Sequence, residues 1–205
     1  MRLAKVAVLS LLPVLILTLP FSQVAYASWY AGNKQLSAYG VKANIGTPTT
    51  QPVLAASGES SWVSAVGDGW VQTGWRYYIG YARPRPYTEA KTNGQYWGLI
   101  EYGTQAWGTY INYTVERYSS NCWRASFPAI GDGDAWCGLD APAEMQVLLE
   151  VHESSSNQAS TDVYGVRRKK ADGSWAKFNQ PNWVEDAPYK VFDKTYPYHW
   201  LAYGP

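Results

Sequence analysis

Residues 70–81 read WVQTGWRYYIGY, and this stretch decides the fold. Successive side chains of a β-strand point to opposite sides, so alternate residues share a face. One face carries Val71, Thr73, Trp75, Tyr77, Ile79 and Tyr81, which we expect to pack in a core. The other face carries Trp70, Gln72, Gly74, Arg76, Tyr78 and Gly80. The stretch therefore predicts a strand with one apolar face and one polar, aromatic face.

The segment Met145–Glu153 repeats this pattern late in the chain. Its apolar face reads Met145, Val147, Leu149 and Val151, and its other face reads Gln146, Leu148, Glu150 and His152. Gln72 and Glu150 both point away from the predicted apolar layer. The non-core face of a curved sandwich often forms a binding concavity, so these two residues become the first candidates for a functional site.

Similar runs fill the rest of the chain and are separated by turns rich in Gly and Pro. The predicted strands are Gly40–Ile45, Ser61–Val66, Trp70–Tyr81, Tyr87–Ala90, Tyr96–Tyr102, Gly108–Arg117, Trp123–Phe127, Met145–Glu153, Val163–Lys169, Trp175–Phe178 and Tyr189–Phe192. No segment shows a convincing helical period. The sequence predicts an all-β fold, an antiparallel β-sandwich or jelly roll.

The N-terminus has the layout of a secretory signal peptide. Arg2 and Lys5 precede a short apolar run, and the small-x-small sequence Ala25-Tyr26-Ala27 follows. We expect residues 1–27 to be a signal peptide and the mature protein to be secreted. Residues 28–54 are a polar, Pro-containing lead-in expected to be partly loose, and residues 55–205 are the predicted sandwich domain.

Composition narrows the function classes. Without Arg2 and Lys5, the 17 basic residues become 15 against 16 acidic residues, a net charge near −1. Such a balance offers no general field for nucleic acid, and no second apolar stretch indicates a membrane span after signal cleavage. The chain contains two cysteines, Cys122 and Cys137, which we expect to form one disulfide in an oxidising environment. We expect no cofactor and no metal.

Common nucleophile and metal motifs are missing, which leaves amides, carboxylates and aromatic rings as candidates. Gln72 and Glu150 are the candidate catalytic residues. The candidate substrate-binding residues are Trp70, Arg76, Tyr78, Glu89 and His152.

The order of several short motifs resembles the glutamic peptidases, the eqolisin family. The stretch 61–74, SWVSAVGDGWVQTG, resembles the Trp-Val strand, Gly-rich turn and Gln-Thr-Gly strand that surround that family's catalytic glutamine. Pro86-Tyr87-Thr88-Glu89 and the strand containing Glu150 follow in the same order, so the resemblance covers about residues 58–153. It departs from the family where Val151 follows Glu150, since the family has Trp there.

The resemblance implies a concanavalin-like sandwich and peptide-bond hydrolysis at acid pH. Glu150 would be the general base on a water held between it and Gln72. The Gln72 amide would donate a hydrogen bond to the oxyanion. Glu89 would be a supporting acid or a substrate contact, and a charged His152 would lower the pKa of Glu150.

Two other functions remain open from the residues alone. The same polar and aromatic face suits a non-catalytic protein that binds carbohydrate or another protein, because sugar rings stack on Trp and Tyr. A glycoside hydrolase would need two carboxylates facing each other across a groove, such as Glu89 or Glu101 with Glu150.

Overall fold

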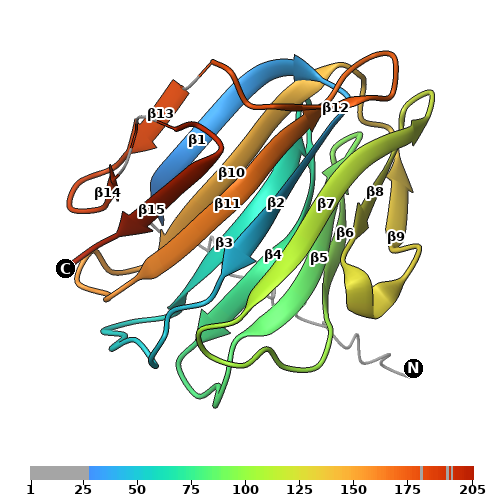
Figure 1. The fold of residues 1–205 in the computed structure, drawn as a ribbon. Helices are drawn as coiled ribbons and strands as arrows, with labels where there is room; N and C mark the ends of the chain where they lie inside the picture. The colour runs from blue at the N-terminus through green and yellow to red at the C-terminus, as the bar shows by residue number, and fades with distance from the viewer. Residues whose placement is uncertain (1–27, 181, 193, 195) are drawn as a thin grey trace, which may run out of the picture.

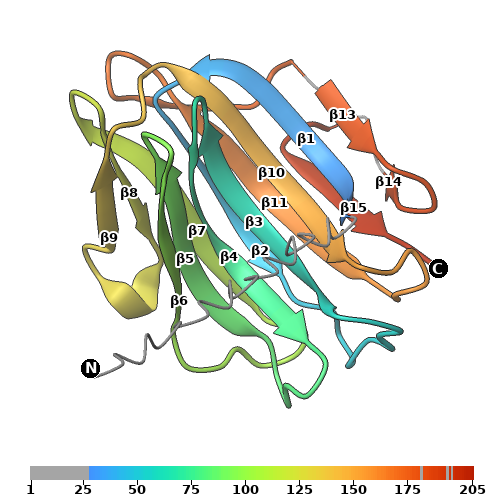
Figure 2. The same cartoon turned by 180° about the vertical axis from the view of Figure 1, so that it is seen from behind.

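The computed structural model describes residues 28–205 except 181, 193 and 195, and it shows two stacked antiparallel sheets (Figures 1 and 2). The first sheet has the order β13 (Asn182–Glu185), β1 (Ser28–Ala38), β10 (Ala143–His152), β3 (Gly58–Val66), β4 (Trp70–Tyr78), β5 (Arg85–Thr92) and β6 (Gln95–Glu101). The expected all-β sandwich is confirmed. The predicted signal peptide lies outside the described residues.

The second sheet faces the viewer in Figure 1. Its order is β14 (Lys190–Phe192), β15 (His199–Tyr203), β11 (Ser160–Lys169), β2 (Gly40–Gly46), β7 (Tyr110–Ser119), β8 (Cys122–Ser126) and β9 (Asp134–Cys137). The short β12 (Trp175–Lys177) pairs with β11 beside this path. Helix in the described chain is limited to the 3-10 turn η1 (Pro128–Ile130).

The core lies between the two sheets and uses the faces that alternation predicts. Val71 and Trp75 of β4 are fully buried, as are Met145 and Val147 of β10. The prediction fails at the end of β4, where Ile79 is 58% exposed. Because Gly80 adopts a φ of 91° and the chain turns back, the strand stops at Tyr78 instead of continuing to residue 81.

The expected loose lead-in differs from the structure, because residues 28–38 form β1 inside the first sheet. This strand pairs with β10 on one side and with β13 on the other. Its buried Asn33 finds hydrogen-bond partners there: the side chain donates to the Pro197 carbonyl and accepts from the backbone N–H of Asn182. Alternation of apolar residues therefore misses a strand whose buried positions are amides.

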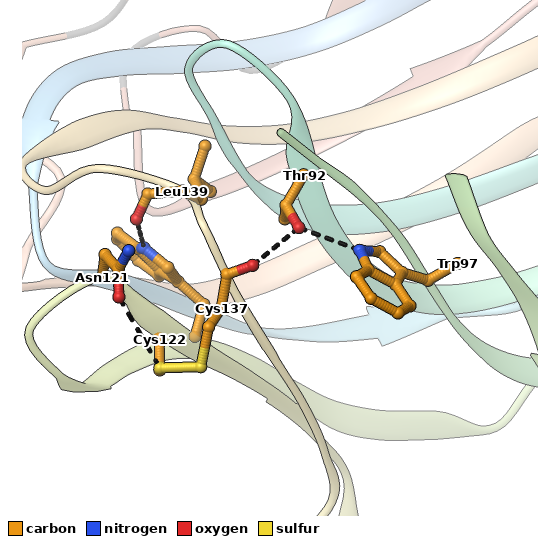
Figure 3. Close-up of a disulfide and its surroundings, with 7 residues drawn as sticks. Thr92, Trp97, Asn121, Cys122, Cys137 and Leu139 are labelled. Atoms are coloured by element: carbon orange, nitrogen blue, oxygen red, sulfur yellow. Dashed lines mark hydrogen bonds between the residues drawn. A yellow bond between two sulfur atoms is a disulfide. The ribbon is translucent and has the colours of Figure 1, made fainter. Parts of the chain in front are cut away.

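The predicted disulfide between Cys122 and Cys137 is confirmed, at directly opposite positions of β8 and β9. Figure 3 shows that it lies where the edges of the two sheets meet. Thr92, the last residue of β5, donates to the Cys137 carbonyl at 2.7 Å and accepts from Trp97 Nε1 at 2.9 Å. The bridge therefore ties together two strands of the second sheet, and the hydrogen bond from Thr92 connects Cys137 to the first sheet.

Candidate functional site

A groove of about 550 Å³ lies on the outer face of the first sheet. β3, β4 and β10 form its floor, because alternate residues of these strands point away from the core. All seven candidate residues named from the sequence line it: Trp70, Gln72, Arg76, Tyr78, Glu89, Glu150 and His152. The structure thus brings one early and one late segment of the chain to a single surface.

The Gln72 side chain is fixed by two neighbours on β5. Its Nε2 donates to Glu89 Oε2 at 2.7 Å and to the Tyr87 hydroxyl at 3.2 Å. Gln72 and Glu89 are direct cross-strand partners in the β4–β5 register, so the ladder itself sets this contact. The amide and the carboxylate form one hydrogen-bonded unit in the groove.

Burial raises the pKa of the Glu89 carboxyl above its ordinary value. Hydrogen bonds from Tyr96 and Gln72 lower it in part, and the charge of Glu150 raises it further. The Tyr96 hydroxyl donates to Glu89 Oε1 at 2.6 Å. A carboxyl with a raised pKa and two donors on its charged form is equipped to take up and release a proton at a higher pH than an exposed glutamate.

A second amide faces Gln72 across the floor. Gln146 of β10, Ser64 of β3 and Gln72 of β4 occupy directly paired positions, so all three share one row across the sheet. The Gln146 amide donates to Glu144, whose carboxylate lies 3.9 Å from Lys34 Nζ. The row therefore carries two amides, each held by a carboxylate, on either side of a small serine.

Glu150 lies in a different row of the sheet, opposite Ser60 and four residues along β10 from Gln146. Its carboxylate accepts from the Tyr30 hydroxyl at 3.0 Å and from Trp62 Nε1 at 3.1 Å. The residue that contacts Gln72 directly is consequently Glu89. Glu150 belongs to a neighbouring polar cluster within the same groove.

His152 completes this second cluster. Its Nδ1 lies 3.7 Å from Glu150 Oε1, its Nε2 lies 3.4 Å from Ser60 Oγ, and its ring stacks on Tyr78 at 5.5 Å between centroids. Burial lowers the pKa of His152, while the Glu150 charge raises it and the Arg76 charge lowers it. The His152 imidazole therefore stays neutral down to a lower pH than the imidazole of an exposed histidine does.

Sequence reasoning missed several groove residues. Tyr30 lies on the unpredicted strand β1, and Ser60 lies just before the predicted start of the strand at Ser61. Trp62 and Gln146 share parity with groove residues of their own strands, and that parity is the signal that points to them. The described residues contain no group of three or more His, Cys, Asp or Glu side chains arranged to hold a metal ion.

The fold and the site together define a class of protein: an all-β sandwich with a polar, aromatic-lined groove on the outer face of one sheet. Scytalido-glutamic peptidase bound to a peptide-based transition state analog shares this fold, with a TM-score of 0.63 and 13% identity over 87% of this chain and 98% of that chain. SCP-B, a member of the eqolisin family of peptidases in a complex with the tripeptide Ala-Ile-His, also matches, with a TM-score of 0.56 and 13% identity over 87% of this chain and 98% of that one.

At this identity the likeness establishes a shared fold. No protein-family model and no curated protein matches the chain. In the part of the chain that the structure describes, no helix is long and apolar enough to cross a membrane.

Proposed function

We propose that this protein is an exported endopeptidase that acts at mildly acid pH, with the Gln72–Glu89 pair as its reacting centre. The observation that carries the proposal is the 2.7 Å hydrogen bond between this amide and this carboxylate in the groove. Support comes from the fold, which is shared with peptidases whose structures contain a peptide-based transition state analog and a tripeptide.

In the proposed reaction, ionised Glu89 takes a proton from a water molecule, and the water oxygen attacks the peptide carbonyl carbon. The Gln72 N–H that now points to Tyr87 turns to the developing oxyanion. Protonated Glu89 then gives its proton to the leaving amine. One group serves as base and acid, so its pKa should lie near the working pH, as the raised pKa of Glu89 favours.

Glu150, the base that the family resemblance implies, has a secondary role in this proposal. Its negative charge contributes to the raised pKa of Glu89. It also holds the Tyr30 and Trp62 side chains at one end of the groove. Replacing it should weaken the reaction less than replacing Glu89.

The test is cleavage of casein and of internally quenched peptides between about pH 3 and pH 7. Gln72→Ala and Glu89→Gln should each lower kcat/KM by about 100-fold or more, and Glu150→Gln by about 10-fold. Gln158→Ala, which changes an exposed glutamine outside the groove, is the matched control. An inactive wild type would end the proposal. Full loss in Glu150→Gln with activity retained in Glu89→Gln would move the base to Glu150.

Carbohydrate binding is the second candidate, because aromatic rings line much of the groove. The rings are those of Tyr30, Trp62, Trp70, Tyr78, Tyr87 and Tyr96. Rings of this kind stack on sugars, and the amide row offers acceptors for hydroxyl groups. Binding of soluble polysaccharides that is lost in Trp70→Ala, together with an absence of peptide cleavage, would favour this function over the first.

A further inference from the structure

At one end of the groove a hydroxyl, an imidazole and a carboxylate lie next to one another in that order. Ser60 Oγ lies 3.4 Å from His152 Nε2, and His152 Nδ1 lies 3.7 Å from Glu150 Oε1. The two ring nitrogens thus face different partners, and each faces the type of group that a serine nucleophile system requires. The Gln72–Glu89 chemistry uses neither Ser60 nor His152.

The strands explain why these residues meet. Ser60 and Glu150 are direct partners in the β3–β10 register, and His152 follows two residues later on the same face of β10. Glu150 is further fixed by the Tyr30 hydroxyl at 3.0 Å and Trp62 Nε1 at 3.1 Å. The carboxylate is therefore a held group that can orient the imidazole, as the third member of a triad does.

A positively charged side chain, Arg76, lies on the strand that pairs with β3 on the side opposite β10. Arg76 is the direct partner of Ser60 in the β3–β4 register, lines the same groove and keeps its guanidinium over the Tyr78 ring at 4.1 Å. The backbone amides of a mid-sheet strand are used in the ladder, so a side chain has to stabilise an oxyanion here. Arg76, whose Nε lies 3.3 Å from Glu101 Oε1, is the positively charged side chain that the register places beside Ser60.

We propose that Ser60, His152 and Glu150 form a second hydrolytic centre, which cleaves carboxylic esters with an apolar or aromatic acyl group through an acyl-Ser60 intermediate. The acyl group would lie against Tyr30, Trp62 and Tyr78, which line this end of the groove. The centre is separate from the peptidase proposed above and does not depend on it.

In the first step Ser60 Oγ forms a bond to the ester carbonyl carbon, and its proton passes to His152 Nε2. The tetrahedral intermediate places its negative oxygen toward Arg76. When the bond to the leaving oxygen breaks, His152 returns that proton to the alcohol. Water then attacks the acyl-serine by the same route, and the carboxylic acid leaves with Ser60 restored.

The surroundings of His152 allow it to act as the general base for Ser60 near neutral pH. The charged and titratable groups facing it are Glu150 and Glu153 from its own segment, Arg76 and Tyr78 from β4, and Tyr30 of β1 beside Glu150. Burial has the largest effect and lowers the pKa of His152, so the ring is a neutral base at about pH 7. The acid peptidase reaction and the ester reaction should therefore separate along the pH axis.

The experiment uses the full chain, a fluorophosphonate probe, and p-nitrophenyl butyrate and benzoate as substrates at about pH 7. We expect mass spectrometry to find the probe on Ser60, and Ser60→Ala and His152→Asn each to lower ester hydrolysis by about 100-fold or more. Ser119→Ala is the control, since Ser119 is an exposed serine of β7 in the other sheet and lies outside the groove. That variant should keep both labelling and hydrolysis.

Three results would overturn the inference: no label on Ser60, unchanged hydrolysis in Ser60→Ala, or equal loss in Ser119→Ala. His152→Asn leaves Ser60 itself in place, so it keeps the test valid should Ser60→Ala fail to fold. Gln72→Ala separates this inference from the proposed peptidase, because it should abolish peptide cleavage and retain ester hydrolysis. A Gln72→Ala variant that loses both reactions would indicate one shared centre and refute the second.

Discussion

The first sheet has two faces made from the same strands, and they differ in what a substitution should change. On β4, Val71 and Trp75 point into the core and are fully buried, whereas Gln72 and Arg76 point into the groove. The inner face is held by apolar packing, while the groove face is held by specific hydrogen bonds. Neighbouring residues of one strand thus serve either the stability of the core or the chemistry of the groove, so a single substitution can change one without the other.

Trp75→Ala should have the largest effect and should act on stability. Trp75 is fully buried and its Nε1 donates to the Gly46 carbonyl of the other sheet at 3.1 Å. Removing it should lower the free energy of unfolding by about 3–5 kcal/mol, measured by urea denaturation. The groove-face counterpart Gln72→Ala should cost about 1 kcal/mol or less. Equal losses from the two variants would contradict the division between the faces.

Cys122→Ser should come next, because the disulfide lies at the sheet edge and belongs to neither face. The bridged residues are 15 apart in sequence, so the chain-entropy model assigns the bond about 3 kcal/mol. Peptide cleavage at a temperature where the variant is folded should be unchanged. An unaltered denaturation midpoint, in the variant or in wild type with reductant, would show that the bridge contributes nothing.

The inner face also carries a buried carboxyl group, that of Glu59, which tests the comparison from the other side. Its side chain is fully buried and neither carboxyl oxygen makes a hydrogen bond of normal geometry. Burial raises the pKa of this carboxyl well above its usual value, and the backbone of Ser160 offsets only part of the shift. The folded state therefore keeps the Glu59 proton to a higher pH than the unfolded state does.

The sign of the pH dependence follows from this difference. Stability from Glu59 is complete below the unfolded glutamate pKa of about 4.3 and declines as the pH rises from there toward the raised folded pKa. Glu59→Gln removes that decline and should be more stable than wild type at about pH 7.5, by about 1–3 kcal/mol. Melting curves from acid to neutral pH check this, and parallel curves for the two proteins would refute it.

Sequence alternation predicted much of the first sheet because its central strands have one apolar face and one polar face. The faces of β4 and β10 follow directly from period two, and so does the meeting of Gln72 and Glu150 on one surface. It missed β9, β13 and β15, which are four or five residues long and lack a long alternating run. The amide-rich β1 was missed for a different reason, since its buried Asn33 finds its hydrogen-bond partners only in distant parts of the chain.

The pairing within the groove depends on register, and register is a property of two strands together. Nothing within β4 says that Gln72 lies opposite Glu89, and nothing within β10 says that Glu150 lies opposite Ser60. For this reason the sequence predicts the groove residues as a set but assigns Glu150 to Gln72. The family resemblance has the same limit, because motif order does not fix cross-strand contacts.

The smallest effect should come from Tyr96→Phe, which removes one hydroxyl from the groove face. The Tyr96 hydroxyl donates to Glu89 Oε1 at 2.6 Å and lowers the pKa of that carboxyl. Without it the pKa of Glu89 should rise, so the acid limb of the pH profile for peptide cleavage should move to higher pH. Tyr118→Phe, at an exposed tyrosine of the other sheet, is the control and should leave the profile in place. Because the phenyl ring is retained, the melting temperature should hardly change, and an unmoved limb would mean that Glu89 does not set the pH dependence.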